Sequence, residues 1–199
     1  MLNKKRNLFF ILISMLLVSC KTDVDKSSIF VKNEKDNKYV TIQYLQDNKI
    51  QIDYDYDNYE KLAPGYFDYF SISLNLEEQQ EYHVKTTVLN FSSPKLFYEG
   101  EEIYSPLNWT VNEESVDEKT LFENIESWPG DIDSQTNIVE IMIRWEWPFD
   151  NLELSDYDYY DSIMGYIFNV DDQKYPGYTI EMDTRISFVL EIESDNKSL

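Results

Sequence analysis

Hydrophobic and polar residues alternate along much of the chain after residue 38, with the period of two that is typical of β-strands. Residues 39–44 and 50–54 alternate on either side of a polar turn at residues 46–49. Strand character recurs in four further segments, at residues 71–76, 82–91, 138–147 and 186–192. Residues 178–182 lie just before the last of these, and we expect the two to pair. The pattern predicts about seven strands in all.

Helical signals are confined to two short segments. The first covers residues 116–125, where Asp117 and Glu118 would place negative charge at a helix N-terminus. The second covers residues 157–168. Parallel strands need helical crossovers, and too few helices are expected to supply them. We therefore predict a mainly β fold, an antiparallel β-sandwich of the jelly-roll or immunoglobulin-like type with one or two short helices.

The N-terminus has a different texture from the rest of the chain. Basic residues at positions 4–6 precede an apolar run over residues 8–18, which is shorter than the roughly 20 residues that cross a bilayer. This arrangement is typical of a secretory signal peptide. The run ends in Leu17-Val18-Ser19-Cys20, which resembles the lipobox of bacterial lipoproteins. The resemblance implies that residues 1–19 are removed and that Cys20 carries a diacylglyceryl group.

The polar, aperiodic residues 20–37 predict a flexible stalk between this lipid and the folded part of the protein. We expect a single domain over residues 38–193, followed by a disordered tail at residues 194–199. The alternatives for the N-terminus are an uncleaved membrane anchor and an ordinary signal peptide. The lipoprotein interpretation places the domain outside the cytoplasm, in a bacterial cell envelope.

The charge of the chain narrows the range of partners. The 199 residues include 17 Lys and Arg against 38 Asp and Glu, a net charge of −21. Removal of residues 1–19 would leave 14 basic residues against 38 acidic ones, a net charge of −24. Binding to nucleic acid needs clustered Lys or Arg, so nucleic acid is not expected as a partner. One Cys and one His also exclude a disulfide framework and a Cys-rich zinc site.

Aspartates and tyrosines are interleaved in two blocks, at residues 53–57 and 156–161. Calcium prefers several oxygen ligands, which such aspartates could supply. The first block starts like an EF-hand loop, but Pro64 takes the position of its bidentate glutamate. The candidate calcium ligands are Asp53, Asp55, Asp57, Asp156, Asp158 and Asp161. The alternative is a solvated acidic edge strand or turn, which discourages aggregation.

The tyrosines of these blocks are candidates for contact with a partner. Tyrosine beside acidic residues suits recognition of proteins, and aromatic rings with carboxylates also suit carbohydrate. The candidate residues are Tyr54, Tyr56, Tyr59, Tyr157, Tyr159 and Tyr160. The alternative is that these side chains fill a half-buried sheet, because tyrosine favours strands.

The sequence carries no recognisable catalytic motif. His83 is the only histidine, and it lies in an expected strand without a nucleophile motif nearby, which favours a surface or half-buried imidazole. A glycine-rich phosphate loop, a Gly-x-Ser-x-Gly segment and an HExxH segment are all missing. We expect no enzymatic activity and no cofactor other than calcium. A hydrolase that uses a carboxylate pair is the remaining enzymatic alternative.

Three segments near the C-terminus carry a second resemblance. Residues 145–150 read Trp-Glu-Trp-Pro-Phe-Asp, residues 161–165 read Asp-Ser-Ile-Met-Gly, and a closing strand follows at residues 186–192. They resemble secreted surface proteins of Gram-positive bacteria in the camelysin and TasA group. This resemblance covers residues 138–192 and implies a β-sandwich. Some members of the group polymerise into filaments by strand exchange, but the group uses an ordinary cleaved signal peptide and not a lipobox.

The residues themselves give a simpler account of the first segment. Trp145 and Trp147 share one face of the expected strand and would pack in the core, and Pro148 would end the strand because it lacks an N–H. Together these features predict a non-enzymatic, lipid-anchored surface protein that binds or assembles with an unknown protein or glycan. A calcium-dependent or carbohydrate-binding module is the alternative.

Overall fold

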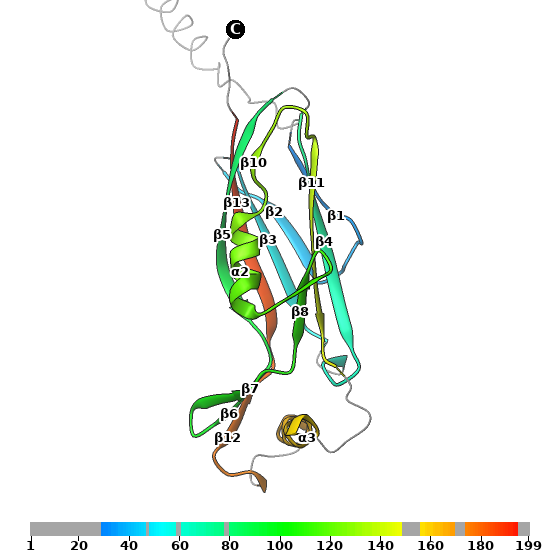
Figure 1. Cartoon of the computed structure of the whole chain (residues 1–199), viewed down its shortest axis with the longest axis vertical. Helices are drawn as coiled ribbons and strands as arrows, with labels where there is room; N and C mark the ends of the chain where they lie inside the picture. The colour runs from blue at the N-terminus through cyan, green and yellow to red at the C-terminus, as the bar shows by residue number, and fades with distance from the viewer. Residues whose placement is uncertain are drawn as a thin grey trace, which may run out of the picture.

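The computed structural model describes residues 29–46, 48–58, 61–77, 80–148, 156–169 and 174–194. Two five-stranded antiparallel sheets face each other, and a three-stranded sheet lies at one end of the pair together with a helix (Figure 1). The prediction of a mainly β, antiparallel sandwich is therefore confirmed.

The first sheet has the strand order β1-β4-β11-β8-β9. Its strands are β1 (Phe30–Asn33), β4 (Phe67–Asn75), β11 (Ile138–Glu146), β8 (Asn108–Val111) and β9 (Glu114–Val116). Along β11, Ile141, Ile143 and Trp145 are buried while their neighbours are more exposed. This is the alternation that the sequence predicts for a strand with one face on the core.

The second sheet has the strand order β10-β5-β13-β3-β2. Its strands are β10 (Gly130–Ile132), β5 (Tyr82–Ser92), β13 (Thr184–Ser194), β3 (Lys49–Tyr56) and β2 (Val40–Tyr44). β2 and β3 form the predicted hairpin, with Ile42 opposite Ile52. Ile52 and Phe188, neighbours on β3 and β13, are fully buried between the two sheets.

Helix α2 (Glu118–Ser127) closes one side of the sandwich, against β5 and β8 (Figure 1). Asp117 is its N-cap and accepts a hydrogen bond from the Thr120 amide at 2.7 Å. The helix buries Leu121 and Ile125 on the core. The first predicted helix is therefore confirmed, displaced by two residues toward the C-terminus.

The third sheet has the order β12-β6-β7 and consists of β12 (Tyr178–Glu181), β6 (Lys95–Tyr98) and β7 (Glu101–Tyr104). Helix α3 (Asp156–Asn169) lies beside it and confirms the second predicted helix (Figure 1). We call the described residues 95–104, 156–169 and 174–183 the cap. The cap lies at the end of the sandwich where β4 begins and β11 ends.

Two predictions about the strands are wrong. The stalk predicted over residues 20–37 is folded from β1 onward, because Val31 is buried and Phe30 to Asn33 pair with β4. The pairing predicted between residues 178–182 and 186–192 also does not occur. β12 pairs with β6 in the cap, whereas β13 lies between β3 and β5. Residues 1–28, which include the predicted signal peptide and Cys20, lie outside the described residues.

Candidate functional site

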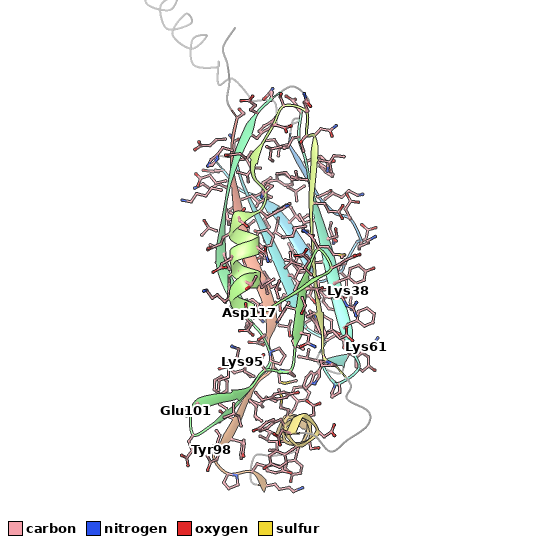
Figure 2. All side chains as sticks on the ribbon, viewed as in Figure 1. Lys38, Lys61, Lys95, Tyr98, Glu101 and Asp117 are labelled. Carbon is pink, nitrogen blue, oxygen red and sulfur yellow. The ribbon has the colours of Figure 1, made fainter. Side chains whose placement is uncertain are left out.

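The cap holds one of the two blocks of aspartate and tyrosine that the sequence linked to recognition, at residues 156–161. It holds eight acidic residues against two lysines, and eight of the 16 tyrosines of the chain. Figure 2 shows Tyr98 and Glu101 at its outer end, with Lys95 where it joins the sandwich. Lys95 is engaged by Glu102 at 2.9 Å and Glu118 at 3.1 Å. The cap is therefore an acidic and aromatic end of the molecule.

The tyrosine rings of the cap pack on one another. Tyr160 stacks on Tyr104 with a centroid distance of 5.2 Å and contacts Tyr159 at 5.6 Å. Tyr98 lies 4.8 Å from Tyr178. Tyr98 and Tyr159 nevertheless remain 41% and 53% exposed. Aromatic side chains have few rotatable bonds, so rings held in this way can offer contact area at a small entropic cost.

Asp161 joins α3 to the rest of the protein. Its Oδ1 accepts a hydrogen bond from the Tyr104 hydroxyl at 2.8 Å and another from the Trp147 indole N–H at 2.9 Å. Burial raises the pKa of this carboxyl above its ordinary value, and the two hydrogen bonds oppose that rise. Its carboxylate is thus an internal anchor of the cap, and Trp147 is buried as the sequence predicted.

The acidic block on β3 lies on another part of the molecule. Asp53 accepts hydrogen bonds from Ser187 and from Gln51, and Asp55 pairs with Arg185 at 2.9 Å. Asp57 follows the end of β3 and is exposed. The block therefore lies on one face of an internal strand, between β13 and β2, and not on the acidic edge strand of the alternative interpretation.

The six candidate calcium ligands are not brought together. Asp53, Asp55 and Asp57 lie on or just after β3, whereas Asp156, Asp158 and Asp161 lie on α3. Within the described ranges, no three or more His, Cys, Asp or Glu side chains are grouped so that they could hold a metal ion. Calcium binding stays a prediction.

The candidate tyrosines that the structure describes also fall into two groups, one on β3 and one on α3. Tyr54 and Tyr56 are 1% and 5% exposed, so the prediction that they contact a partner is wrong for this structure. They share the inner face of β3 with Ile50 and Ile52, because side chains two residues apart point the same way. Tyr159 is exposed and Tyr160 is partly buried in the cap. Tyr59 and the side chain of Tyr157 lie outside the described residues.

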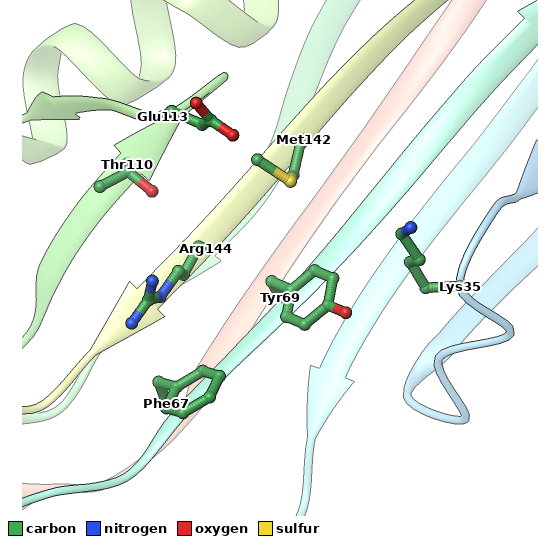
Figure 3. A pocket seen from close by; sticks show the side chains of 7 residues that line it. All are labelled: Lys35, Phe67, Tyr69, Thr110, Glu113, Met142 and Arg144. Atoms are coloured by element: carbon green, nitrogen blue, oxygen red, sulfur yellow. The ribbon is translucent and has the colours of Figure 1, made fainter.

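A groove on the outer face of the first sheet was not predicted from the sequence. It has a volume of about 540 Å³ and is lined by Lys35, Phe67, Tyr69, Thr110, Glu113, Met142 and Arg144 (Figure 3). The only signal in the sequence is the spacing of two residues between Phe67 and Tyr69 and between Met142 and Arg144, which places each pair on one face of its strand. Their strands β4 and β11 are far apart in the chain, so only the pairing of the strands makes one surface of them.

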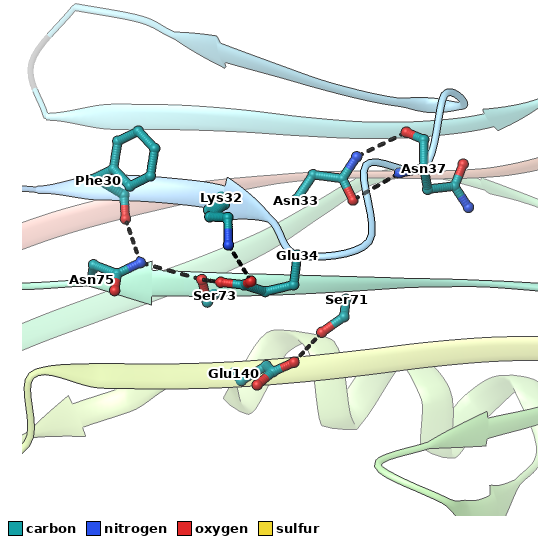
Figure 4. A network of polar contacts seen from close by, with 9 residues as sticks. All are labelled: Phe30, Lys32, Asn33, Glu34, Asn37, Ser71, Ser73, Asn75 and Glu140. Atoms are coloured by element: carbon teal, nitrogen blue, oxygen red, sulfur yellow. Dashed lines mark hydrogen bonds and ion pairs between the residues drawn. The ribbon is translucent and has the colours of Figure 1, made fainter.

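Next to this groove, polar side chains cover the outer face of β4. Glu34 accepts hydrogen bonds from Ser73 and Lys32, and Glu140 accepts one from Ser71 (Figure 4). Ser71 and Ser73 are therefore buried although they point away from the core of the sandwich. His83 is exposed on β5 and contacts Asp131, in agreement with the expected surface imidazole.

The comparisons with known proteins do not assign this chain to a family. Neither the scan against protein-family models nor the search among curated proteins finds a match for this chain. The resemblances to lipoproteins and to the camelysin and TasA group therefore stay predictions. Within the described residues, neither helix is long and apolar enough to cross a membrane.

Proposed function

We propose that this protein is a non-enzymatic, lipid-anchored protein of a bacterial cell envelope, which binds a macromolecular partner through its cap. The observation that carries the proposal is the position of the cap. The described chain begins at Ile29 and ends at Ser194, both at one end of the sandwich, and the cap lies at the other end (Figure 1). An anchor at Cys20 would hold the end of the sandwich that carries Ile29 at the membrane.

The length of the sandwich supports this orientation. β5 and β13 each have 11 residues, which corresponds to about 35 Å at the usual rise of a strand. The nine residues from Cys20 to Ile29 add at most about 30 Å. A lipid-anchored molecule would therefore present the cap well away from the bilayer, and its net negative charge would be repelled by anionic headgroups.

The chemistry of the cap favours a partner with positive charge. Its excess of carboxylates would attract clustered Lys or Arg and speed up association. The exposed rings of Tyr98 and Tyr159 would then supply apolar and cation–π contacts. A basic segment of another protein satisfies both requirements.

Two experiments test the two parts of the proposal. Metabolic labelling with an alkyne analogue of palmitate should label the wild-type protein and not Cys20→Ser, and only the wild-type protein should stay in the membrane fraction. For the cap, a decalysine peptide should bind the full chain in detergent and dissociate as salt is added. The double variant Tyr98→Ser/Tyr159→Ser should weaken that binding. Tyr66→Ser, which removes an exposed tyrosine outside the cap, is the matched control.

Carbohydrate is the second candidate ligand of the cap, because exposed tyrosine rings beside carboxylates also suit sugars. A glycan array probed with the wild-type protein and the same double variant would identify this alternative. Calorimetry with calcium chloride, alone and before the array, tests whether calcium takes part. Absence of binding to both decalysine and the array would contradict the role given to the cap.

A further inference from the structure

The groove on the outer face of the first sheet has a charged side chain at each of two opposite sides. Lys35 and Glu113 lie across from one another, with Tyr69 and Met142 between them (Figure 3). Neither forms an ion pair with any residue that the structure describes. Arg144 differs, because it pairs with Glu146 at 2.6 Å and lies over the Phe67 ring at 4.6 Å. The groove therefore offers one cation, one anion and an apolar floor.

Both charged residues are held on turns that are fixed to the sheet. Glu113 follows Asn112 in the β8–β9 turn, where both residues have positive φ, 49° and 71°. Asn112 exchanges hydrogen bonds with the backbone of Met142 on β11, both at 2.9 Å. The turn carrying Lys35 is tied to β4, because the Glu34 amide donates to the Ser71 carbonyl at 2.9 Å. The backbone of both turns is thus fixed to the sheet, and the side chains of Lys35 and Glu113 are exposed to a ligand.

We propose that this groove binds a short peptide with both termini free, with its carboxylate at Lys35 and its amino group at Glu113. The charges of such a peptide complement those of the groove, and its apolar side chains would pack on Phe67, Tyr69 and Met142. Three strand spacings separate β8 from β1, or about 14 Å. An extended peptide of about four residues spans that distance.

A tetrapeptide with alanine at both ends and two central leucines is the probe, used with free termini, N-acetylated, C-amidated or blocked at both ends. Binding to the full chain in detergent is measured by calorimetry and by NMR of ¹³C-methyl methionine. The free peptide should shift the Met142 signal and leave that of Met164, which is buried in the core, unchanged. Blocking either end should weaken binding about tenfold, the effect of losing one charge-assisted contact.

Charge variants separate this site from general electrostatic attraction. Lys35→Glu and Glu113→Lys should each weaken binding of the free peptide about tenfold, although they change the net charge in opposite directions. The double exchange should bind again, because the symmetric peptide can lie in the reverse direction. Lys119→Glu on α2 is a matched control and should bind like the wild-type protein, since its exposed side chain lies outside the groove.

Three results would overturn the proposal: no shift of Met142 with millimolar peptide, equal binding of free and fully blocked peptides, or wild-type binding by both single charge variants. The site is independent of the function proposed for the cap. Tyr98→Ser/Tyr159→Ser should leave the Met142 shift unchanged, so failure of one proposal is distinguishable from failure of the other.

Discussion

Trp145 donates its indole N–H across the core to the hydroxyl oxygen of Tyr54, at 2.7 Å. The Tyr54 hydroxyl in turn donates to Asp68 at 2.9 Å, and Asp68 also accepts from the Asn37 side chain at 3.0 Å. The first bond joins β11 of the first sheet to β3 of the second, and Asp68 lies on β4 of the first sheet. A buried polar chain of this kind fixes how the two sheets lie against each other, because each group would be costly to leave without a partner.

Removal of the Tyr54 hydroxyl should therefore destabilise the protein, because the two hydrogen bonds that it makes are lost with it. Tyr54→Phe leaves the Trp145 N–H buried without an acceptor and takes one donor from Asp68. We expect the free energy of unfolding to fall by about 2 kcal/mol, measured by urea denaturation. Tyr56→Phe is the matched control, because its hydroxyl makes no hydrogen bond with the described residues, and it should change stability by less than about 0.5 kcal/mol. Equal effects of the two variants would contradict the role given to the chain.

The same two tyrosines should make the protein sensitive to alkali. Burial raises the pKa of Tyr56 to about 12 and that of Tyr54 still further. In the unfolded chain both would ionise near pH 10, so above that pH the folded state binds more protons than the unfolded state. Stability should consequently fall as the pH rises above about 10. Urea denaturation from pH 9 to pH 12 should show a shallower fall for Tyr56→Phe than for the wild-type protein.

The two blocks of interleaved aspartate and tyrosine form different structures, a strand in β3 and a helix in α3. In β3 the period of two is kept, so the aspartates face solvent and Tyr54 and Tyr56 join Ile52 in the core. That outcome was predictable from the isoleucines of the same strand. In α3 the 3.6-residue period spreads the same residue types around a helix, and Asp161 turns inward. The choice between strand and helix decided which tyrosines remained exposed.

The elements that the sequence did not predict are short or depend on distant partners. β1 has one buried residue, Val31, and is held in place by its pairing with β4. The groove draws Lys35, Thr110 and Met142 from three parts of the chain, so no local pattern could show it. By contrast, the acidic pair Asp117 and Glu118 and the alternation of β3 are local signals, and the helix and the strand that they predict are both confirmed.

Tyr44 protects the free edge of β1. Its hydroxyl accepts a hydrogen bond from the Val31 amide at 3.0 Å and lies 3.4 Å from the Val31 carbonyl oxygen, to which it donates. Tyr44→Phe removes both contacts and exposes these backbone groups at a sheet edge. Amide hydrogen exchange at Val31 should become about fivefold faster, while exchange at Ile72 in the centre of β4 should not change. An unchanged rate at Val31 would contradict this account.

Two substitutions of Asp161 distinguish the contribution of its hydrogen bonds to stability from the contribution of its charge. Both bonds go to Oδ1, so Asp161→Asn can keep them, whereas Asp161→Ala removes the acceptor of the Trp147 indole N–H and the bond from the Tyr104 hydroxyl. The alanine variant should lose about 2–3 kcal/mol of stability, and the asparagine variant about 1 kcal/mol or less. Urea denaturation measures both values, with loss of the ring contact between Tyr104 and Tyr160 followed by near-ultraviolet circular dichroism.

The charge of Asp161 should affect how the stability of the protein depends on pH. Because burial raises the pKa of Asp161, the folded state holds this proton more tightly than the unfolded state, whose carboxyl titrates near pH 4. The contribution of Asp161 to stability is therefore greatest at low pH and declines as the pH rises from about 4 through the folded-state pKa. Other carboxylates contribute equally to the wild-type protein and to Asp161→Asn, so the difference in stability between the two isolates this group. That difference should move in favour of the asparagine variant as the pH rises, and a difference independent of pH would show that the carboxyl is not desolvated in the cap.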